Sequence, residues 1–193
     1  MFQGNKLVLI LPGILMLVML VGGYQFLQGS EAITNEELKD MVEYEAEIQE
    51  TESGLYIDAN WDWTIMPIEG LYGEDYLSVY FMDGDKVRTD VVIEKAELQL
   101  LHSDQIIEVQ TGEKVANGVI FSFSNKIVEH ESFGNLGQLQ VVVSGTDLTE
   151  NDVRIQLLHT WTEHAPLEKE DATFSAPTFT NAANVPYWIR KFQ

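Results

Sequence analysis

The sequence predicts a mainly β protein: an antiparallel immunoglobulin-like β-sandwich of about eight or nine strands, preceded by an N-terminal transmembrane helix and a short acidic helix. Three observations carry this prediction. An apolar run lies near the N-terminus, a helix-start signal opens an acidic segment after it, and apolar side chains recur with a period of two from Gly54 onward. A chain of 193 residues has room for one globular domain and an anchor.

The N-terminal segment is apolar enough to suggest a membrane span. Residues 7–21 contain no polar side chain, and the run continues to residue 27 with only Gln25 interrupting it. About 20 residues of helix match the roughly 30 Å hydrocarbon core of a bilayer. We therefore expect a transmembrane signal-anchor helix over 7–27. A cleavable signal peptide is the alternative, because small residues suited to cleavage follow the run.

Charge predicts the orientation of this segment. Lys6 is the only base among the first 29 residues, and all 31 acidic residues come later. The positive-inside rule then leaves 1–6 in the cytoplasm and exports the C-terminal part. The expected location is the cell membrane, with one span and an exported domain in the cell envelope. Secretion after signal-peptide cleavage is the alternative.

Residues 28–53 form an acidic stretch for which the sequence predicts a helical spacer. Thr34 and Glu37 have the spacing of a capping box, which marks a helix start. Leu38, Met41 and Val42 begin a narrow apolar stripe at helical spacing, which indicates a helix over 35–51. Such a helix is either a charged spacer that can dock a partner or a helix that lies on the domain.

The remainder, 54–193, alternates apolar and polar residues as half-buried strands do. Turn residues rich in Gly, Asn and Asp separate the runs, and the segment 147–152 has the composition of a single helical turn that connects two strands. The predicted strands include or lie within 61–65, 77–82, 87–93, 96–101, 106–110, 119–124, 138–144, 153–161 and 185–192.

Composition excludes several functions. The formal net charge of −20 opposes binding to nucleic acid, and the absence of cysteine removes disulfides, thiolate metal sites and cysteine nucleophiles. Phosphate-binding loops, dinucleotide fingerprints and hydrolase motifs are missing from the sequence. We therefore expect no enzyme, although a hydrolase of the envelope that uses a pair of carboxylates is a third hypothesis.

One stretch resembles a calcium loop in its spacing. Its oxygen-bearing residues fall at positions one, three, five and twelve of such a loop, and they are Asp58, Asn60, Asp62 and Glu69. Trp63, however, occupies the position where the loop requires glycine, and no helical pattern flanks the stretch. A strand with the polar residues on one face explains the same pattern. Calcium is thus a possible ligand rather than an expected cofactor, and no other cofactor is indicated.

Aromatic residues supply the other binding candidates. Trp61 and Trp63 share a strand face with Ile65 and are expected in the core. His159 shares a face with Ile155 and Leu157 and is expected to be a core or sheet-edge histidine. Three tyrosines close to these tryptophans are predicted surface residues for recognition, and they are Tyr72, Tyr76 and Tyr80.

The leading hypothesis is a single-pass, membrane-anchored, exported β-sandwich that acts as a binding or assembly module with a protein partner in the cell envelope. An exported, acidic, calcium-binding domain is the alternative.

Overall fold

The computed structural model describes residues 6–29, 33–128, 131–145 and 147–192. The chain divides into two compact units, Met1–Ala32 and Ile33–Gln193. Most of the predicted cytoplasmic segment, residues 1–5, lies outside the described residues, as do residues 30–32 of the predicted spacer.

The described residues of the first unit, 6–29, form helix α1 (Lys6–Gly29), with Pro12 inside it. Crossing a bilayer core takes about 20 consecutive apolar residues in a helix. Within the ranges that the structure describes, no helix combines the length and apolarity that a membrane crossing needs. This finding overturns the predicted signal-anchor over 7–27, and with it the membrane localisation that was inferred from that segment.

The second unit begins with a helix that is shorter than the sequence suggested. Helix α2 (Asn35–Met41) starts with the predicted capping box, in which the Thr34 hydroxyl and the Glu37 carboxylate each accept the other residue's backbone N–H. The helix ends at Met41, and strand β1 (Val42–Thr51) follows directly. The prediction of a helix as far as residue 51 is therefore wrong, because β1 pairs along its whole length with β2.

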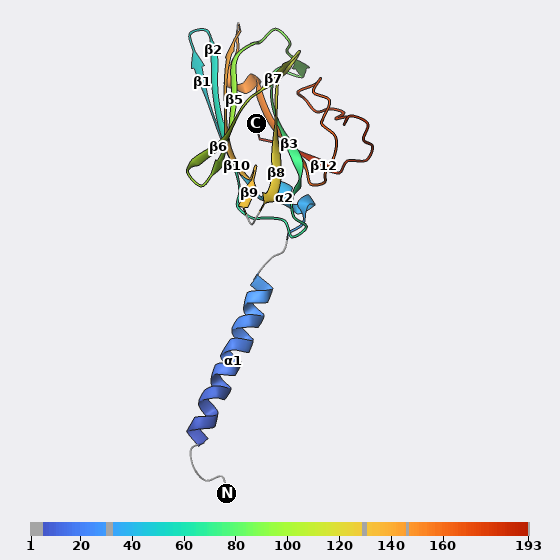
Figure 1. Cartoon of the computed structure of the whole chain (residues 1–193). Coiled ribbons are helices and arrows are strands. Elements are labelled where there is room, and N and C mark those ends of the chain that lie inside the picture. Colours follow the sequence, from blue (N-terminus) through green and yellow to red (C-terminus); the bar gives the residue numbers. More distant parts are fainter. Residues whose placement is uncertain (1–5, 30–32, 129–130, 146, 193) are drawn as a thin grey trace. The chain divides into compact units, whose positions relative to one another are not determined.

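The β structure consists of two antiparallel sheets, which confirms the mainly β prediction (Figure 1). Sheet A has five strands in the order β1-β2-β10-β5-β6. Besides β1, its members are β2 (Gly54–Trp63), β10 (Leu136–Ser144), β5 (Val92–His102) and β6 (Gln105–Thr111).

Sheet B has seven strands, with the order β12-β11-β3-β8-β7, while β4 pairs with β3 and β9 with β8. Its members are β12 (Tyr187–Lys191), β11 (Val153–Thr160), β3 (Tyr72–Asp83), β8 (Gly118–Val128), β7 (Glu113–Val115), β4 (Lys86–Val87) and β9 (Glu131–Phe133). The single 3-10 turn η1 (Glu150–Asp152) connects β10 in sheet A to β11 in sheet B, as the composition of 147–152 indicated.

The inward faces of the two sheets share one hydrophobic core. Trp61 and Trp63 are buried in it, as predicted, and the Trp61 indole donates a 2.9 Å hydrogen bond to the Gly134 carbonyl. Gly137 lies opposite Trp61 on β10, where a β-carbon would collide with the indole ring.

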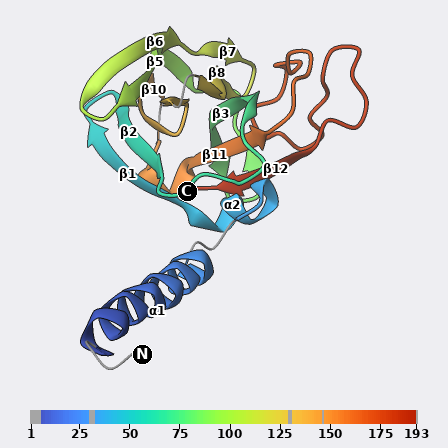
Figure 2. The ribbon, with the colours of Figure 1, turned by 60° about the horizontal axis from the view of Figure 1, so that its bottom comes forward.

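A second apolar cluster lies on the other face of sheet B. The long segment between β11 and β12, residues 161–186, covers this face (Figure 2). Phe174 and Phe179 from the segment pack there against Tyr76 and Tyr80 of β3. Both faces of β3 are therefore covered, whereas no described segment of the unit Ile33–Gln193 covers the outer face of sheet A in this way.

Candidate functional site

The outer face of sheet A carries a groove with a volume of about 860 Å³. A second, adjoining hollow of about 400 Å³ shares Glu45 and Asn60 with it. The groove is lined by residues of α2, β1, β2, β10 and β12 with the end of β5, which are Asp40, Met41, Val42, Glu43, Tyr44, Glu45, Asn60, Asp62, Thr64, Leu101, Leu136, Gly137, Gln138 and Arg190.

Strand register explains why this face is acidic. Side chains alternate between the two faces of a strand, and directly paired residues point to the same face. Tyr44 pairs with the buried Trp61, so the neighbouring Glu43, Glu45 and Glu47 all project outward from β1, where all three are exposed. Three glutamates in succession therefore line the edge of one sheet face.

The partners of these glutamates on β2 are also acids or an amide. Glu47 pairs with Asp58, Glu45 with Asn60, and Glu43 with Asp62. Like charges directly opposite each other on neighbouring strands destabilise a sheet. Among the salt bridges found in the described parts of the chain, none neutralises a carboxylate of these pairs.

Amide side chains continue the rows across the sheet. Gln138 pairs with Asn60 and Gln140 with Asp58. The Asp58 carboxylate accepts hydrogen bonds from the Gln138 side chain at 2.9 and 3.0 Å and from the Gln140 side chain at 3.2 Å. The amides thus hold Asp58 in place while leaving its charge on the face.

The structure brings together three of the four predicted calcium ligands. Asp58, Asn60 and Asp62 lie at alternate positions on the outer face of β2, as a strand requires. Glu69 lies elsewhere and accepts hydrogen bonds from the backbone and side chain of Asn35 at 2.9 and 3.0 Å. In the described ranges, no group of three or more His, Asp or Glu side chains is arranged to hold a metal ion.

The three predicted surface tyrosines have different environments. Tyr72 is 66% exposed, whereas Tyr76 and Tyr80 are buried under the 161–186 segment, which corrects the prediction for both. The Tyr76 hydroxyl donates to Glu74 at 2.6 Å and accepts from the Leu167 backbone at 3.0 Å. Burial and the Glu74 hydrogen bond raise the pKa of Tyr76 well above its ordinary range.

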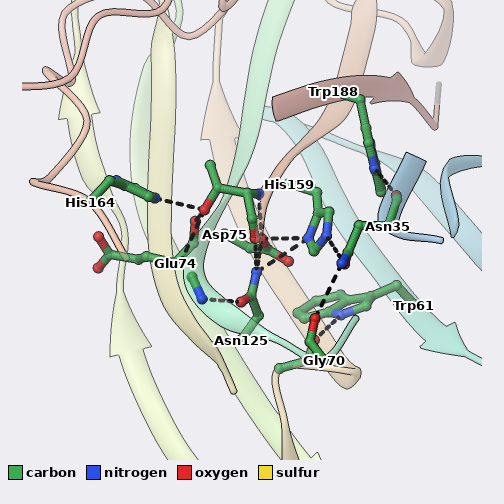
Figure 3. A network of polar contacts seen from close by, with 12 residues as sticks. Asn35, Trp61, Gly70, Glu74, Asp75, Asn125, His159, His164 and Trp188 are labelled. Carbon is green, nitrogen blue, oxygen red and sulfur yellow. Dashed lines mark hydrogen bonds and ion pairs between the residues drawn. The ribbon is translucent and has the colours of Figure 1, made fainter. Parts of the chain in front are cut away.

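A buried polar network lies between the two sheets at the end near α2 (Figure 3). The His159 ring contacts the Asp75 carboxylate through Nδ1 at 2.8 Å and the Asn35 side-chain oxygen through Nε2 at 3.3 Å. Asp75 also accepts from the Thr160 backbone N–H and from the Asn125 amide. Burial raises the pKa of the Asp75 carboxyl, and the contact with His159 acts in the opposite direction.

Indole rings surround His159 on several sides. Its ring centroid lies 4.9 Å from that of Trp63, 4.8 Å from that of Trp188 and 5.7 Å from that of Trp161. The imidazole is fully buried, as predicted for a core histidine. Its acidic partner could not be predicted from the sequence, because Asp75 and His159 are 84 residues apart.

This network positions one end of the outer-face groove. The Asn35 carbonyl at the start of α2 accepts a 2.7 Å hydrogen bond from the Trp188 indole on β12. Arg190, also on β12, donates to the Lys39 carbonyl near the end of α2. Because Asp40 and Arg190 both line the groove, its shape at this end depends on how α2 and β12 are held together.

The chain matches no protein-family model and no curated protein sequence. Among solved structures it is similar to one described as "AvmM Catalyzes Macrocyclization in Alchivemycin A Biosynthesis", with 10% identity and a TM-score of 0.32. That likeness covers 77% of this chain and 87% of the other. Similarity this low carries no argument about activity.

Proposed function

We propose that the unit Ile33–Gln193 is a binding or assembly module of immunoglobulin-like architecture that holds a basic protein partner on the outer face of sheet A. Two antiparallel sheets around a shared core support this architecture. The uncovered groove on sheet A supports the position of the binding surface.

The paired acids on β1 and β2 are the observation that carries the proposal. Glu43 faces Asp62 and Glu47 faces Asp58 with no base bridging either pair in the described residues. Such pairs oppose folding in the isolated module, and a cationic partner would remove that cost on binding. The formal net charge of −20 would further attract a basic partner over longer distances at low salt.

A role in binding accounts for the polar groups better than catalysis does. Asp75 and His159, the pair best suited to proton transfer, are both fully buried, so neither contacts solvent or a substrate. Their partners Asn35, Asn125 and Thr160 link separate elements of the fold. We therefore assign the network to structure and propose that the module is not an enzyme.

The test measures binding of the full chain to oligolysine, a simple basic probe, at low ionic strength. The triple variant Glu43→Gln, Glu45→Gln and Glu47→Gln removes three exposed charges from the face with little change of shape. We expect its affinity to be about tenfold lower, since each exposed ion pair contributes up to about 1 kcal/mol.

A matched control removes the same charge elsewhere. Asp85, Asp104 and Glu163 are exposed, lie outside β1 and β2, and can be changed to Asn, Asn and Gln. The control should bind almost as well as the unaltered chain. Equal weakening in both triple variants would mean that overall charge, and not this face, attracts the probe.

A further inference from the structure

The outer edge of β1 is a long and regular strand edge with no strand beside it in the described parts of the chain. Sheet A ends in β1 and β6, and sheet B ends in β12 and β7. The β1 ladder to β2 runs from Val42 to Thr51 without a register shift, whereas the β5–β6 ladder shifts near Leu100. Strand β7 has three residues and β12 has five. An unpaired strand edge of this length is a template for another strand.

The backbone groups at this edge point outward at alternate residues. Thr51 and Gly54 close the hairpin with two residues between them. In an antiparallel ladder, residues alternate between those bonded to the partner strand and those whose N–H and C=O groups face away. Thr51 forms a hydrogen-bonded pair with Gly54, so every second residue before Thr51 also bonds to β2. The residues between them have N–H and C=O groups that face away from β2, and they include Tyr44, Ala46, Ile48 and Glu50.

The two faces of β1 differ in chemistry. Glu43, Glu45 and Glu47 project to the outer face and are exposed. Tyr44, Ala46 and Ile48 project to the core side, where they are only partly buried. A strand added here would meet three negative charges on one face and three apolar side chains on the other.

We propose that the edge of β1 binds an extended segment of a partner protein in which basic and apolar residues alternate, and that this segment pairs with β1 as a sixth strand of sheet A. This inference rests on the proposed function, because it names the form in which the basic partner is bound. Basic side chains would lie beside the three glutamates, and apolar side chains would cover Tyr44, Ala46 and Ile48. Main-chain hydrogen bonds would supply affinity, as in other cases of strand addition.

A second copy of this chain fits the middle of the same edge less well than a basic segment. Two β1 strands related by a two-fold axis pair residues that point to the same face. Centring the pairing on Glu45 places Glu43 opposite Glu47 of the copy and Glu45 opposite itself. Moving the centre by one residue to Ala46 still places Glu45 opposite Glu47. In these two central registers, pairing between copies is opposed by charge, while a basic segment is favoured.

The test compares three synthetic peptides for binding to the full chain. The first is acetyl-(Lys-Val)4-amide. The second carries an N-methyl group on every valine. If the peptide adds antiparallel to β1 with valine opposite the apolar residues, the valine N–H groups point toward β1. The third carries N-methyl groups on every lysine, whose N–H groups would point away. All three have the same side chains and charge. Of the three, the second alone lacks the N–H groups that would donate to β1.

We expect the peptide methylated on valine to bind at least about tenfold more weakly than the other two, which should bind alike. A variant then locates the site. Ala46→Pro removes an outward N–H, and proline is tolerated at strand edges, whereas Ala46→Ser keeps the N–H and serves as its control. Ala46→Pro should remove the difference between the peptides, and Ala46→Ser should preserve it.

Equal affinity of the three peptides for the unaltered chain would overturn strand addition, even if Ala46→Pro failed to fold. In that case, loss of oligolysine binding in the triple glutamate variant would still support the acidic face as the proposed function. A concentration-dependent dimer of the full chain that Ala46→Pro disrupts would also overturn the inference, because a second copy would then occupy the edge.

Discussion

His159 Nδ1 lies 2.8 Å from Asp75 Oδ1, and both side chains have no exposed surface. The hydrogen bonds around this pair determine where its proton lies. The Asn35 amide nitrogen donates to Glu69 and to the Gly70 carbonyl, neither of which can donate in return. The Asn35 side-chain oxygen therefore faces His159 as an acceptor, and His159 Nε2 must carry the hydrogen.

The first prediction concerns this proton. Nitrogen-15 NMR of the histidine side chains at pH 7 should show His159 protonated at Nε2. A His159 signal with an unprotonated Nε2 would contradict the assigned network, because Asn35 could then not be bound through its oxygen. Exposed His102 serves as an internal reference for a ring in solvent.

The second prediction concerns acid sensitivity at Asp171, in the segment that covers sheet B. Burial alone would raise its pKa, but hydrogen bonds from Ser175, Thr173 and Asn117 outweigh burial and hold the pKa at about 2, below the ordinary 3.8. The folded protein thus binds this proton more weakly than the unfolded chain. The resulting stability is present above about pH 4 and is lost as the pH falls through about 2.

Urea unfolding of Asp171→Asn measures this contribution. We expect a loss of about 1–3 kcal/mol at pH 7, since several hydrogen bonds to a charged acceptor are weakened. The difference from the unaltered chain should shrink as the pH falls from 4 toward 2. A difference that stays constant over that range would show that the charge of Asp171 is not the cause.

The third prediction concerns the N-terminal limit of the second unit. A chain that begins at residue 53 lacks β1, and with it the buried Val42 and the cover that β1 gives to one edge of β2. Loss of Val42 alone should cost about 1.5–3 kcal/mol, the usual contribution of one fully buried side chain. Urea midpoints should therefore fall sharply relative to a chain that begins at Ile33. Equal midpoints would mean that β1 contributes little to the fold.

Strand β1 also shows where the sequence misleads. Its residues Val42, Tyr44, Ala46 and Ile48 alternate strictly with polar residues, which is a strand pattern. The capping box at Thr34 and the helical spacing of Leu38, Met41 and Val42 suggested instead that one helix continued. The alternation was the better signal for residues 42–48. The capping box marks only where a helix starts, and the two turns of α2 are long enough to form it.

The later strands were more predictable. Trp61 and Trp63, together with the alternating residues of β3, β8, β10 and β11, lie in strands as their two-residue period indicated. The burial of Tyr76 and Tyr80 on the second face of β3 was not predictable, because Phe174 and Phe179, which cover them, lie 94 to 103 residues later in the chain. The acidic pairs on sheet A likewise depend on strand register, which a single sequence does not define.

The fourth prediction concerns salt. Like-charge pairs such as Glu47 and Asp58 should make the melting temperature of the full chain rise with added sodium chloride, since screening weakens repulsion. At low salt, the variant Glu43→Gln, Glu45→Gln and Glu47→Gln should have a higher melting temperature than the control variant changed at Asp85, Asp104 and Glu163. Its melting temperature should also depend less on the salt concentration. Removing one like-charge pair should raise the free energy of unfolding by about 0.2–1 kcal/mol.

Calcium separates this effect from a structured metal site. Calcium chloride and sodium chloride at equal ionic strength should stabilise the chain similarly. Saturable stabilisation by millimolar calcium against a constant sodium background, lost in Asp62→Ala, would contradict screening and support a calcium site at Asp58, Asn60 and Asp62.

Amide chemical-shift mapping can locate the surface that binds a basic probe. Oligolysine added to the nitrogen-15-labelled full chain should shift amides of β1, β2 and β10 around Glu45, Asn60 and Gln138 if the outer face of sheet A is the binding surface. Amides near Asp85 and Glu163 should shift little. Shifts spread evenly over all acidic loops, or concentrated at Asp85 and Glu163, would mean that the outer face of sheet A is not the binding surface.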